Sequence, residues 1–396
     1  MPTAVGHNSS NTTAWCSIYF SILNAHHDSL GENVTLPGLS NCSESPPIET
    51  ALIVTSSLIF YTYSVPVIFT IGIVGNVVSL RIFLSRSMRK LSASTYLVAL
   101  STSDILALIF YVLVEWLRWG FPHLTDNQGL NFLNLAGVCQ ALFYLSYVSR
   151  FLSAWFIVTF TVERYIGVCH PLKRKDICGS RSAQKVLGSL VVISLVVMMF
   201  KPILTSSREV QSMKFKVYRC LPDPEHPMLS FVLDSVYGLS ITIVPFLIIS
   251  VLNALIIRRL LHRYKRHKRI NVITEESIIR MEFTVILLVV SFVFIVLNLP
   301  YCFVWCKRFF LSRKGMHEGP GSSDVGVDFD NYEGVLMITR VVFYMNYCVN
   351  FFLYSVTGAY FRKELKILVF YKSQYGEYMN CSRNGNSSPT TPQSWV

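Results

Sequence analysis

Ionisable side chains interrupt several long apolar runs of the sequence, and they are the residues best placed to do chemistry there. They are Asp104, Glu115, Arg150, Glu163, Arg164 and Arg340. A charged side chain costs roughly 2.5–3.5 kcal/mol at the centre of a helix in lipid, so each one needs an opposite charge, polar partners, an ion or a ligand. The adjacent Glu163 and Arg164 can neutralise each other at a membrane edge, although an arginine that only marks the interface is an alternative.

Membrane-spanning helices are the elements that must position these side chains. The 396 residues are 52% hydrophobic and only 15% charged, whereas a soluble domain carries about 25% charged residues. Several windows exceed the ~20 apolar residues that cross a bilayer, and a helix satisfies all backbone polar groups within such a segment. We therefore predict an all-α membrane protein, a seven-transmembrane helix bundle with spans at about 58–83, 92–117, 138–170, 186–204, 229–257, 280–305 and 334–357.

The charge pattern between the spans predicts the orientation of the chain. Basic loops follow spans one, three and five, and a basic segment follows span seven, which places all four in the cytosol. We therefore interpret the net charge of +12 as a topology signal and expect no nucleic-acid partner. N-glycosylation motifs begin at Asn8, Asn11, Asn33 and Asn41, so the tail 1–57 is predicted to be extracellular. An extracellular N-terminus and a cytosolic segment after the last span require an odd number of spans. We therefore predict a multi-pass protein of the plasma membrane.

The seven spans and their loops form one predicted domain, 58–357, and two segments follow it. Residues 358–371 predict a short amphipathic eighth helix that lies on the inner membrane surface and contacts lipid. Residues 372–396 are polar and are predicted to form a disordered cytoplasmic tail. Between spans six and seven, a loop rich in Gly, Ser and Asp is predicted at 312–331.

Polar and proline landmarks occur in order along the spans. They are Gly75-Asn76, Asp104, Cys139, Glu163-Arg164-Tyr165, Pro245, Pro300 and Asn350-Phe351-Phe352-Leu353-Tyr354. Across 58–371 this pattern resembles the rhodopsin-like G-protein-coupled receptors. Within that family, Asn298-Leu299-Pro300 together with Asn350-Phe351 is similar to neuropeptide receptors of the FMRFamide/myosuppressin sort.

Four positions depart from the pattern of that family. Val192 and Asn298 stand where the family usually has tryptophan, and Asn253 stands where it often has tyrosine. Phe351 replaces the proline of span seven, which predicts a less kinked helix. The replacement of tryptophan by Asn298 puts in doubt the aromatic side chain that switches position in span six of the family. The departures do not change the resemblance to rhodopsin-like receptors.

The resemblance implies a sodium site in the middle of the bundle. The five residues at the family's sodium positions are Asn76, Asp104, Ser153, Asn346 and Asn350. A carboxylate with hydroxyl and amide oxygens suits a hard cation. The alternative is a buried Asp104 that is held by hydrogen bonds from the amides. We expect no other cofactor.

The resemblance also implies a disulfide between Cys139, at the outer end of span three, and Cys220 in the second outer loop. Both positions lie on the predicted oxidising side of the membrane. Two free thiols are the alternative.

At the inner end, the resemblance assigns residues that couple the bundle to a heterotrimeric G protein. They are Glu163, Arg164, Tyr165, Asn298, Pro300, Asn350 and Tyr354. Arg164 is expected to turn inward and to meet the G protein after span six moves. Receptors of this family often hold that arginine with an acid on span six, but here Arg280 stands near that place and Glu282 lies on another helix face. We therefore expect a weak lock, with Glu163 as the only acid, and some basal activity.

The family's ligand-facing positions are occupied by charged, aromatic and small polar side chains. They are Glu115, Ser146, Tyr147, Arg150, Tyr301, Trp305, Arg340, Phe343 and Tyr344. Amine receptors have an aspartate in place of Ser146, and opsins have a lysine in place of Tyr344. We predict a ligand with an anionic or strongly accepting group near Arg150 and a cationic group near Glu115, which a peptide amide with a basic residue satisfies. An internal Glu115–Arg340 salt bridge is the alternative, and it leaves Arg150 unpaired.

The C-terminal tail predicts two further partners. Phosphorylation of Ser387, Ser388, Thr390 and Thr391 would recruit arrestin, and a polar tail without that role is the alternative. The last residues, Ser394-Trp395-Val396, fit the C-terminal peptide that PDZ domains bind as an added strand.

The predicted function is that of a receptor for an extracellular neuropeptide that signals through heterotrimeric G proteins. Within the family, the alternative is a receptor for a small acidic or lipid ligand drawn to Arg150 and Arg340. From another class, the alternative is a membrane transporter, but no internal repeat is visible. No P-loop, nucleophile elbow or zinc signature occurs in the sequence, so we expect no enzyme activity.

Overall fold

The computed structural model describes six stretches of the chain: 48–125, 130–172, 178–211, 216–267, 275–318 and 323–369. The predicted glycosylation sites Asn8, Asn11, Asn33 and Asn41 lie outside these stretches. The predicted phosphorylation and PDZ sites between 387 and 396 also lie outside them.

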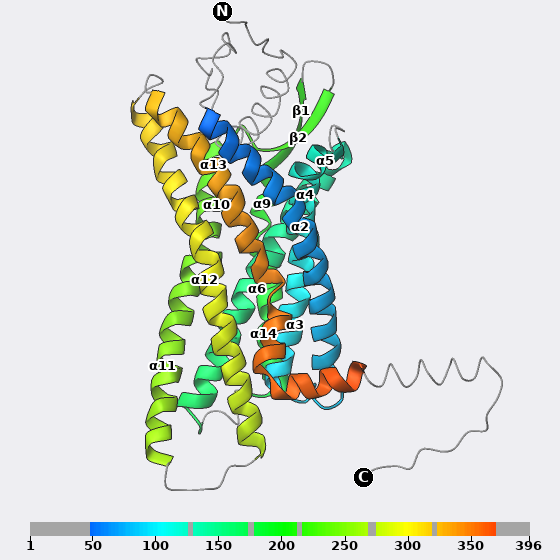
Figure 1. Ribbon diagram of the computed structural model, residues 1–396, viewed down its shortest axis with the longest axis vertical. Coiled ribbons are helices and arrows are strands. Elements are labelled where there is room, and N and C mark those ends of the chain that lie inside the picture. Colours follow the sequence, from blue (N-terminus) through cyan, green and yellow to red (C-terminus); the bar gives the residue numbers. More distant parts are fainter. Residues whose placement is uncertain are drawn as a thin grey trace, which may run out of the picture.

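The described chain is a bundle of long helices that run along one axis (Figure 1). Six segments of it are long and apolar enough to cross a membrane: Ile53–Phe83, Ser92–Trp119, Val138–Cys169, Ser180–Ile203, Pro227–His262 and Met281–Val304. A seventh is completed when the bent pair Gly334–Tyr347 and Asn350–Thr357 is taken as one span. The predicted fold class, a seven-transmembrane helix bundle, is confirmed.

Spans one and three are continuous helices, α2 (Ile48–Phe83) and α6 (Val138–Cys169). Span two is composite, and its parts are α3 (Ser92–Ala107), the π-helical segment η1 (Leu108–Leu113) and α4 (Val114–Trp119). The π turn contains an extra residue, so it rotates the faces of the helix that follows it. Glu115 lies on that helix, α4. We did not predict this segment, because no Pro or Gly marks it. The short helices α5 (Phe121–Thr125) and η2 (Asn131–Asn134) lead on toward span three.

Span four and the outer loop after it end in a β-hairpin. The elements are α8 (Ser180–Val197), α9 (Phe200–Ile203), β1 (Thr205–Gln211) and β2 (Lys216–Pro222). The strands are antiparallel, with Ser207 opposite Cys220. Cys220 forms a disulfide with Cys139, and their Cα atoms are 6.0 Å apart. The predicted disulfide is confirmed, and it joins the hairpin to the outer end of α6.

Span five is interrupted once. Its two helices, α10 (Pro227–Ile241) and α11 (Ile243–His267), meet at Thr242, three residues before Pro245. Because Pro245 has no N–H, the carbonyl four residues earlier loses its helical partner. At this break the Thr242 hydroxyl donates to the carbonyl oxygen of Gly238 at 2.6 Å, and the same oxygen accepts the Thr242 N–H.

Span six lies in α12 (Glu275–Glu318), and α13 (Ser323–Tyr344) begins span seven. Residues 312–318 and 323–331 of the predicted loop 312–331 are therefore helical, and for those residues the loop prediction was wrong. The segment after Val304 contains several strong helix formers, and no proline follows Pro300 until position 320. Scattered Gly, Ser and Asp residues were not enough to end either helix.

Span seven bends by 51° between its two parts. After α13 come the 3₁₀ turn η3 (Met345–Tyr347) and then α14 (Asn350–Thr357). The side-chain amide of Asn346 donates to Phe343 O at 3.0 Å, and that of Asn76 donates to Tyr347 O at 2.7 Å. These side chains bond carbonyl groups that a continuous helix would pair with its own N–H groups. The expectation of a less kinked span seven was wrong, because asparagines break the ladder without a proline.

A short eighth helix, 359–369, follows span seven and lies across the end of the bundle (Figure 1). Phe361 is fully buried, and its ring centroid lies 5.4 Å from that of Phe83 on α2. Ile367 and Val369 are more than half exposed. One buried aromatic and an exposed apolar end fit a helix that packs on the bundle and rests on a membrane surface.

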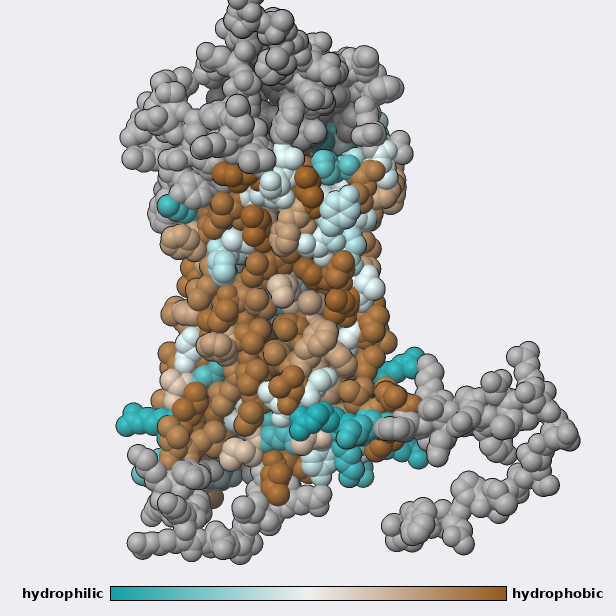
Figure 2. Space-filling view, in the orientation of Figure 1, coloured by the Kyte–Doolittle hydropathy of each residue, from teal (hydrophilic) through white to brown (hydrophobic). Residues whose placement is uncertain are grey.

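Apolar side chains lie on the outside of the bundle as well as in its core. Figure 2 shows hydrophobic residues over the middle of the molecule, with hydrophilic residues gathered near one end. Val192 and Val196 on α8 are 60% and 67% exposed. An apolar surface of this extent would be a liability in water and is what lipid requires. The valine at position 192 thus faces outward, away from the polar clusters inside.

Candidate functional site

Three polar clusters lie inside the bundle, at its inner end, its middle and its outer half. The inner cluster contains Glu163, Arg164 and Ser92. The middle cluster contains Asn76, Asp104, Ser153, Asn346 and Asn350. The outer cluster, as we define it, contains Glu115, Arg118, Arg150, Lys201, Asp234 and Arg340.

In the middle cluster, Asp104 of α3 is fully buried and accepts two hydrogen bonds from other spans. The Ser153 hydroxyl of α6 donates to its Oδ1 at 2.6 Å. The Asn350 amide of α14 donates to its Oδ2 at 2.7 Å. Three of the five predicted sodium residues are therefore in direct contact, and they tie spans two, three and seven together.

The other two predicted residues, Asn76 and Asn346, use their amide N–H groups on backbone carbonyls. Their Oδ1 atoms are buried and accept no hydrogen bond. An orphaned buried oxygen is costly, and a cation ligated by it would remove that cost. The donor set therefore fits a hard cation, and it also contains the hydrogen-bonded aspartate of the alternative interpretation.

At the inner end, Glu163 and Arg164 are buried and form an ion pair with each other. The Ser92 hydroxyl donates to Glu163 Oε1 at 2.8 Å, and Arg164 Nη2 donates to the Ser92 oxygen at 3.3 Å. The guanidinium carbon of Arg164 lies 5.5 Å from the ring centroid of Phe160. Among the described side chains, Glu163 is the acid paired with Arg164.

Glu282 on α12 has a different partner. Its Oε1 accepts a hydrogen bond from the Tyr360 N–H at 2.7 Å, and the N–H groups of Ala359 and Phe361 also face the carboxylate. Glu282 thus caps the N-terminus of the eighth helix, where the helix dipole favours a negative charge. The side chain of Arg280 lies outside the described part of the chain.

The remaining residues predicted for activation contact partners other than Arg164. Tyr354 is fully buried, with ring centroids 5.3 Å from Phe83 and 5.7 Å from Phe361. Asn298 is buried, and its amide donates to Phe294 O at 2.6 Å within α12. Three further residues sit elsewhere: exposed Pro300, Asn350 in the middle cluster, and Tyr165 against His170.

In the outer cluster, Glu115 of α4 lies between two arginines. Its carboxylate oxygens are 3.8 Å from Arg118 Nη1 and 3.7 Å from Arg340 Nη1. The internal Glu115–Arg340 ion pair, which the sequence left open as an alternative, is present. The Nε atoms of Arg118 and Arg340 are buried without a hydrogen-bond partner, so one carboxylate serves two incompletely satisfied guanidinium groups.

Arg150 of α6 lies among tyrosine rings. Its guanidinium carbon is 4.0 Å from the ring centroid of Tyr111, 4.8 Å from that of Tyr147 and 5.3 Å from that of Tyr237. Its Nε–H donates to Ser146 O at 3.1 Å. No carboxylate of the described residues lies within ion-pair distance of this guanidinium.

Lys201 and Asp234 join spans four and five through an ion pair. Lys201 Nζ lies 2.9 and 2.7 Å from the two carboxylate oxygens of Asp234. The Tyr147 hydroxyl donates to Asp234 Oδ1 at 2.9 Å, and the Tyr147 ring stacks on Tyr237 with centroids 4.1 Å apart. Asp234 therefore orients one of the rings that cover Arg150.

The other predicted ligand residues are packed at different depths. Tyr344 is fully buried and contacts the rings of Tyr61 and Tyr111, with centroids 6.3 and 5.2 Å away. Ser146 and Phe343 are also buried. Tyr301 is half-buried and packs on Phe343, and the side chain of Trp305 lies outside the described part. Glu115, Arg150 and Arg340 are thus the predicted ligand residues that belong to the outer cluster, and Tyr147 packs against it at Arg150.

Four residues near Arg150 are absent from the ligand positions predicted from the sequence: Lys201, Asp234, Tyr111 and Tyr237. Lys201 and Asp234 carried a usable signal, because both are ionisable residues inside predicted apolar spans, the criterion that identified Arg150 and Glu115. The two tyrosines carried no such signal. Their position around Arg150 depends on the π turn of span two and on the packing of α10 against α6.

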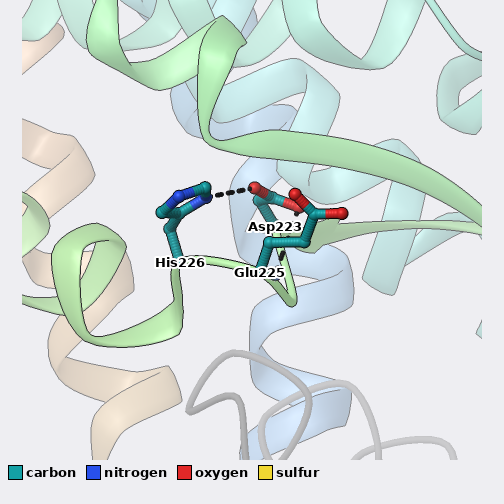
Figure 3. Close-up of side chains that lie close together, drawn as sticks. All are labelled: Asp223, Glu225 and His226. Atoms are coloured by element: carbon teal, nitrogen blue, oxygen red, sulfur yellow. Dashed lines mark hydrogen bonds and ion pairs between the residues drawn. The ribbon is translucent and has the colours of Figure 1, made fainter.

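Asp223, Glu225 and His226 form a separate exposed group just before α10 (Figure 3). Within the described residues, this is the one group of three such side chains whose ligand atoms gather, all within 4.8 Å. His226 Nδ1 lies 3.0 Å from Asp223 Oδ2, and this hydrogen bond lowers the pKa of the Asp223 carboxyl. The contribution of the pair to stability is therefore complete above the ordinary pKa of an aspartate and is lost as the pH falls through the lowered value. We assign the group a structural role in the turn.

Comparison with known proteins gives a consistent result. The family profile of the 7 transmembrane receptor (rhodopsin family) matches residues 75–354. The thyrotropin-releasing hormone receptor of Homo sapiens is 28% identical over 159 residues, which cover 39% of this chain and 36% of that protein. The FMRFamide receptor of Drosophila melanogaster is 25% identical over 309 residues, 76% of this chain and 52% of that protein. The neurotensin receptor type 1 of Mus musculus is 24% identical over 330 residues, 75% of this chain and 72% of that protein.

Proposed function

The chain belongs to the rhodopsin family of seven-transmembrane receptors, and we propose that it is a receptor for an extracellular peptide that promotes nucleotide exchange on a heterotrimeric G protein. Its similarity to the thyrotropin-releasing hormone receptor covers about a third of that protein. The observation that carries the proposal is the family match over 75–354, together with three relatives that are all named as peptide receptors.

The arrangement of the polar clusters supports this mechanism. Ligand contacts would form in the outer cluster, around Arg150 and Arg340. The middle cluster at Asp104 connects spans two, three and seven by hydrogen bonds. At the inner end, Arg164 is paired only with its neighbour Glu163 among the described acids, so a modest rearrangement would free it for a G protein. Each cluster joins different spans, and a ligand that moves one span therefore strains the contacts of the next.

The test is GTPγS binding to membranes from cells that express the full chain, with a neuropeptide library as the probe. We expect at least one peptide to raise nucleotide exchange, and we expect the alanine variant of Arg150 to lose that response at normal surface density. A matched flux assay measures whether the same cells take up the active peptide, which would indicate a transporter. Peptide uptake without nucleotide exchange would contradict the receptor proposal.

We further propose that a sodium ion binds in the middle cluster. Asp104, Ser153 and the orphaned oxygens of Asn76 and Asn346 would hold it. The ion would add a positive charge beside a buried carboxylate that, among the described residues, accepts two hydrogen bonds from neutral side chains. Sodium is expected to stabilise the resting arrangement of spans two, three and seven.

The proposed location is the plasma membrane, with the N-terminus outside the cell. The family and the apolar helices support a multi-pass membrane protein. Arrestin, a PDZ-domain protein and the lipid surface under the eighth helix remain predicted partners. The first two depend on tail residues outside the described part of the chain.

A further inference from the structure

The outer cluster contains more positive than negative charge. Its four cationic side chains are Arg118, Arg150, Lys201 and Arg340, and its two anionic side chains are Glu115 and Asp234. These residues come from spans two, three, four, five and seven, so they surround a common region of the outer half. Because charge in a poorly hydrated interior is costly without compensation, such a region favours the entry of an anion.

Both carboxylates of the cluster are already engaged within the protein. Glu115 lies between Arg118 and Arg340. Asp234 accepts hydrogen bonds from Lys201 and from the Tyr147 hydroxyl. A cationic ligand group would have to displace a cation of the protein from one of them. The expected cationic group near Glu115 is therefore disfavoured by this geometry.

Arg150 is the cation of this cluster without a carboxylate. Among the described residues, its one hydrogen bond runs from Nε to Ser146 O, and its two terminal NH₂ groups have no acceptor. The side chain keeps a minor exposed fraction, although rings from spans two, three and five surround it. Aromatic faces partly compensate a guanidinium but leave its NH₂ edge free to bind.

We propose that the ligand presents a carboxylate, which the terminal NH₂ groups of Arg150 bind beside the rings of Tyr111, Tyr147 and Tyr237. This inference rests on the proposed receptor function and specifies the chemical class of its ligand. Asp234 is a positioning residue, since it holds the Tyr147 hydroxyl and does not itself meet the ligand.

The planar fork of a guanidinium matches the two oxygens of a carboxylate, and the charge-assisted bonds are about twice as strong as neutral ones. A carboxamide presents one acceptor and an NH₂ group, and that NH₂ would point at the donors of Arg150. An amine would meet the excess positive charge of the cluster. The site therefore discriminates by attraction of the acid and by repulsion of the amine.

The experiment compares matched probes on the full chain in membranes, with GTPγS binding as the readout. One arm uses neuropeptides synthesised as pairs, with each carboxylate either free or converted to the amide. The second arm uses small organic carboxylic acids and their primary amides. We expect the active acid to be roughly 10- to 100-fold more potent than its amide, the range that a charged hydrogen bond supplies.

The decisive variant is Arg150→Gln, in which acid and amide forms should become equally potent to within about threefold. The matched control is Arg208→Gln, which removes the same charge from an exposed position on β1. The control should keep the full preference for the acid. If Arg150→Gln does not reach the cell surface, Arg150→Lys keeps the charge without the fork and should reduce the preference without abolishing it.

The outcomes separate this inference from the proposed function. Peptides that activate equally well as acid and amide overturn the carboxylate assignment and leave the receptor function in place. If a small organic acid acts through Arg150 and no peptide is active, the carboxylate assignment is supported and the proposal of a peptide ligand is contradicted. A failure of every probe on surface-expressed protein contradicts both.

Discussion

Each arginine inside this bundle is compensated in a different way, and that compensation decides which ligands or partners the side chain can still bind. Arg164 is paired with the preceding glutamate, Arg340 shares Glu115 with Arg118, and Arg150 has tyrosine faces in place of an acid. Cation–π contacts supply roughly 0.5–2 kcal/mol each. They stabilise Arg150 in the apo protein while leaving its hydrogen-bonding edge available.

Asp104 tests the sodium proposal at the residue scale. We expect NaCl to raise the melting temperature of the purified wild-type protein relative to choline chloride at equal ionic strength, because an ion that binds only the folded state stabilises it. Asp104→Asn keeps the volume and one acceptor oxygen but removes the charge, so its melting temperature should not depend on sodium. A thermal shift assay measures both. An equal sodium effect in the variant would contradict the site.

Lys201 and Asp234 test whether the buried ion pair between spans four and five is a unit. Asp234→Asn leaves the buried Lys201 without its counter-ion, which we expect to cost about 2 kcal/mol and lower the melting temperature by roughly 4–8 °C. In the double variant Lys201→Met with Asp234→Asn, no charge is left alone, so part of the loss should be recovered. Additive losses in a thermal melt would show that the two residues act independently.

At the scale of elements, the interruptions of the helices place the functional side chains. The π turn η1 precedes Glu115, the break at Thr242 follows the part of span five that carries Asp234, and the 3₁₀ turn η3 contains Asn346. A regular helix would present other faces at these points. The eighth helix is placed in a similar way, because Glu282 of span six caps its first turn.

The cap by Glu282 predicts an effect on basal signalling. In the proposed mechanism, span six leaves the bundle before a G protein reaches Arg164, and the bond from Tyr360 N–H to Glu282 would oppose that movement. Glu282→Ala should therefore raise basal GTPγS binding several-fold, since a charge-assisted hydrogen bond supplies about 1.5–3 kcal/mol. Glu282→Gln, which keeps an acceptor oxygen, should remain closer to the wild type.

The control for this prediction is Glu364→Ala. Glu364 lies on the same eighth helix, and no hydrogen bond joins it to α12 among the described residues. Its replacement removes the same charge from the helix region without touching the cap. Equal basal rates in the Glu282 and Glu364 variants would show that the cap does not restrain span six.

At the scale of the whole molecule, the two ends of the bundle differ in chemistry. One end carries the disulfide-linked hairpin and the outer cluster, and the other carries Arg164 and the eighth helix. Figure 1 shows the hairpin and the eighth helix at opposite ends of the long axis. In the proposed receptor, a signal between them would pass along the spans, through the hydrogen bonds around Asp104.

The orientation of the whole molecule can be tested directly. An epitope tag at the N-terminus should be detected on intact cells, whereas a tag at the C-terminus should require permeabilisation, because an odd number of spans separates them. Enzymatic removal of N-linked glycans should increase the electrophoretic mobility of the wild type. The variant with Asn8, Asn11, Asn33 and Asn41 changed to Gln should show no such shift. Detection of both tags on intact cells would rule out this topology.

The sequence alone determined the class of fold and the order of its landmarks. Long apolar runs leave a helix as the only segment that satisfies its own backbone in lipid, and this requirement is local. The same reasoning located Asp104, Glu115, Arg150 and Arg164, since a charge in an apolar run stands out without any knowledge of its neighbours. The pairing of Cys139 with Cys220 followed from the family resemblance, and the structure confirmed it.

Only the tertiary structure decided which of these residues meet. Lys201 pairs with Asp234, Glu282 caps the eighth helix, and Arg150 lies among tyrosines from three spans. Each contact depends on which helix faces turn toward each other, and those faces are set by a π turn, a proline break and a 3₁₀ bend together with packing between spans. Hydropathy is a property of each segment by itself, whereas the choice of partner is a property of segments that are distant in sequence.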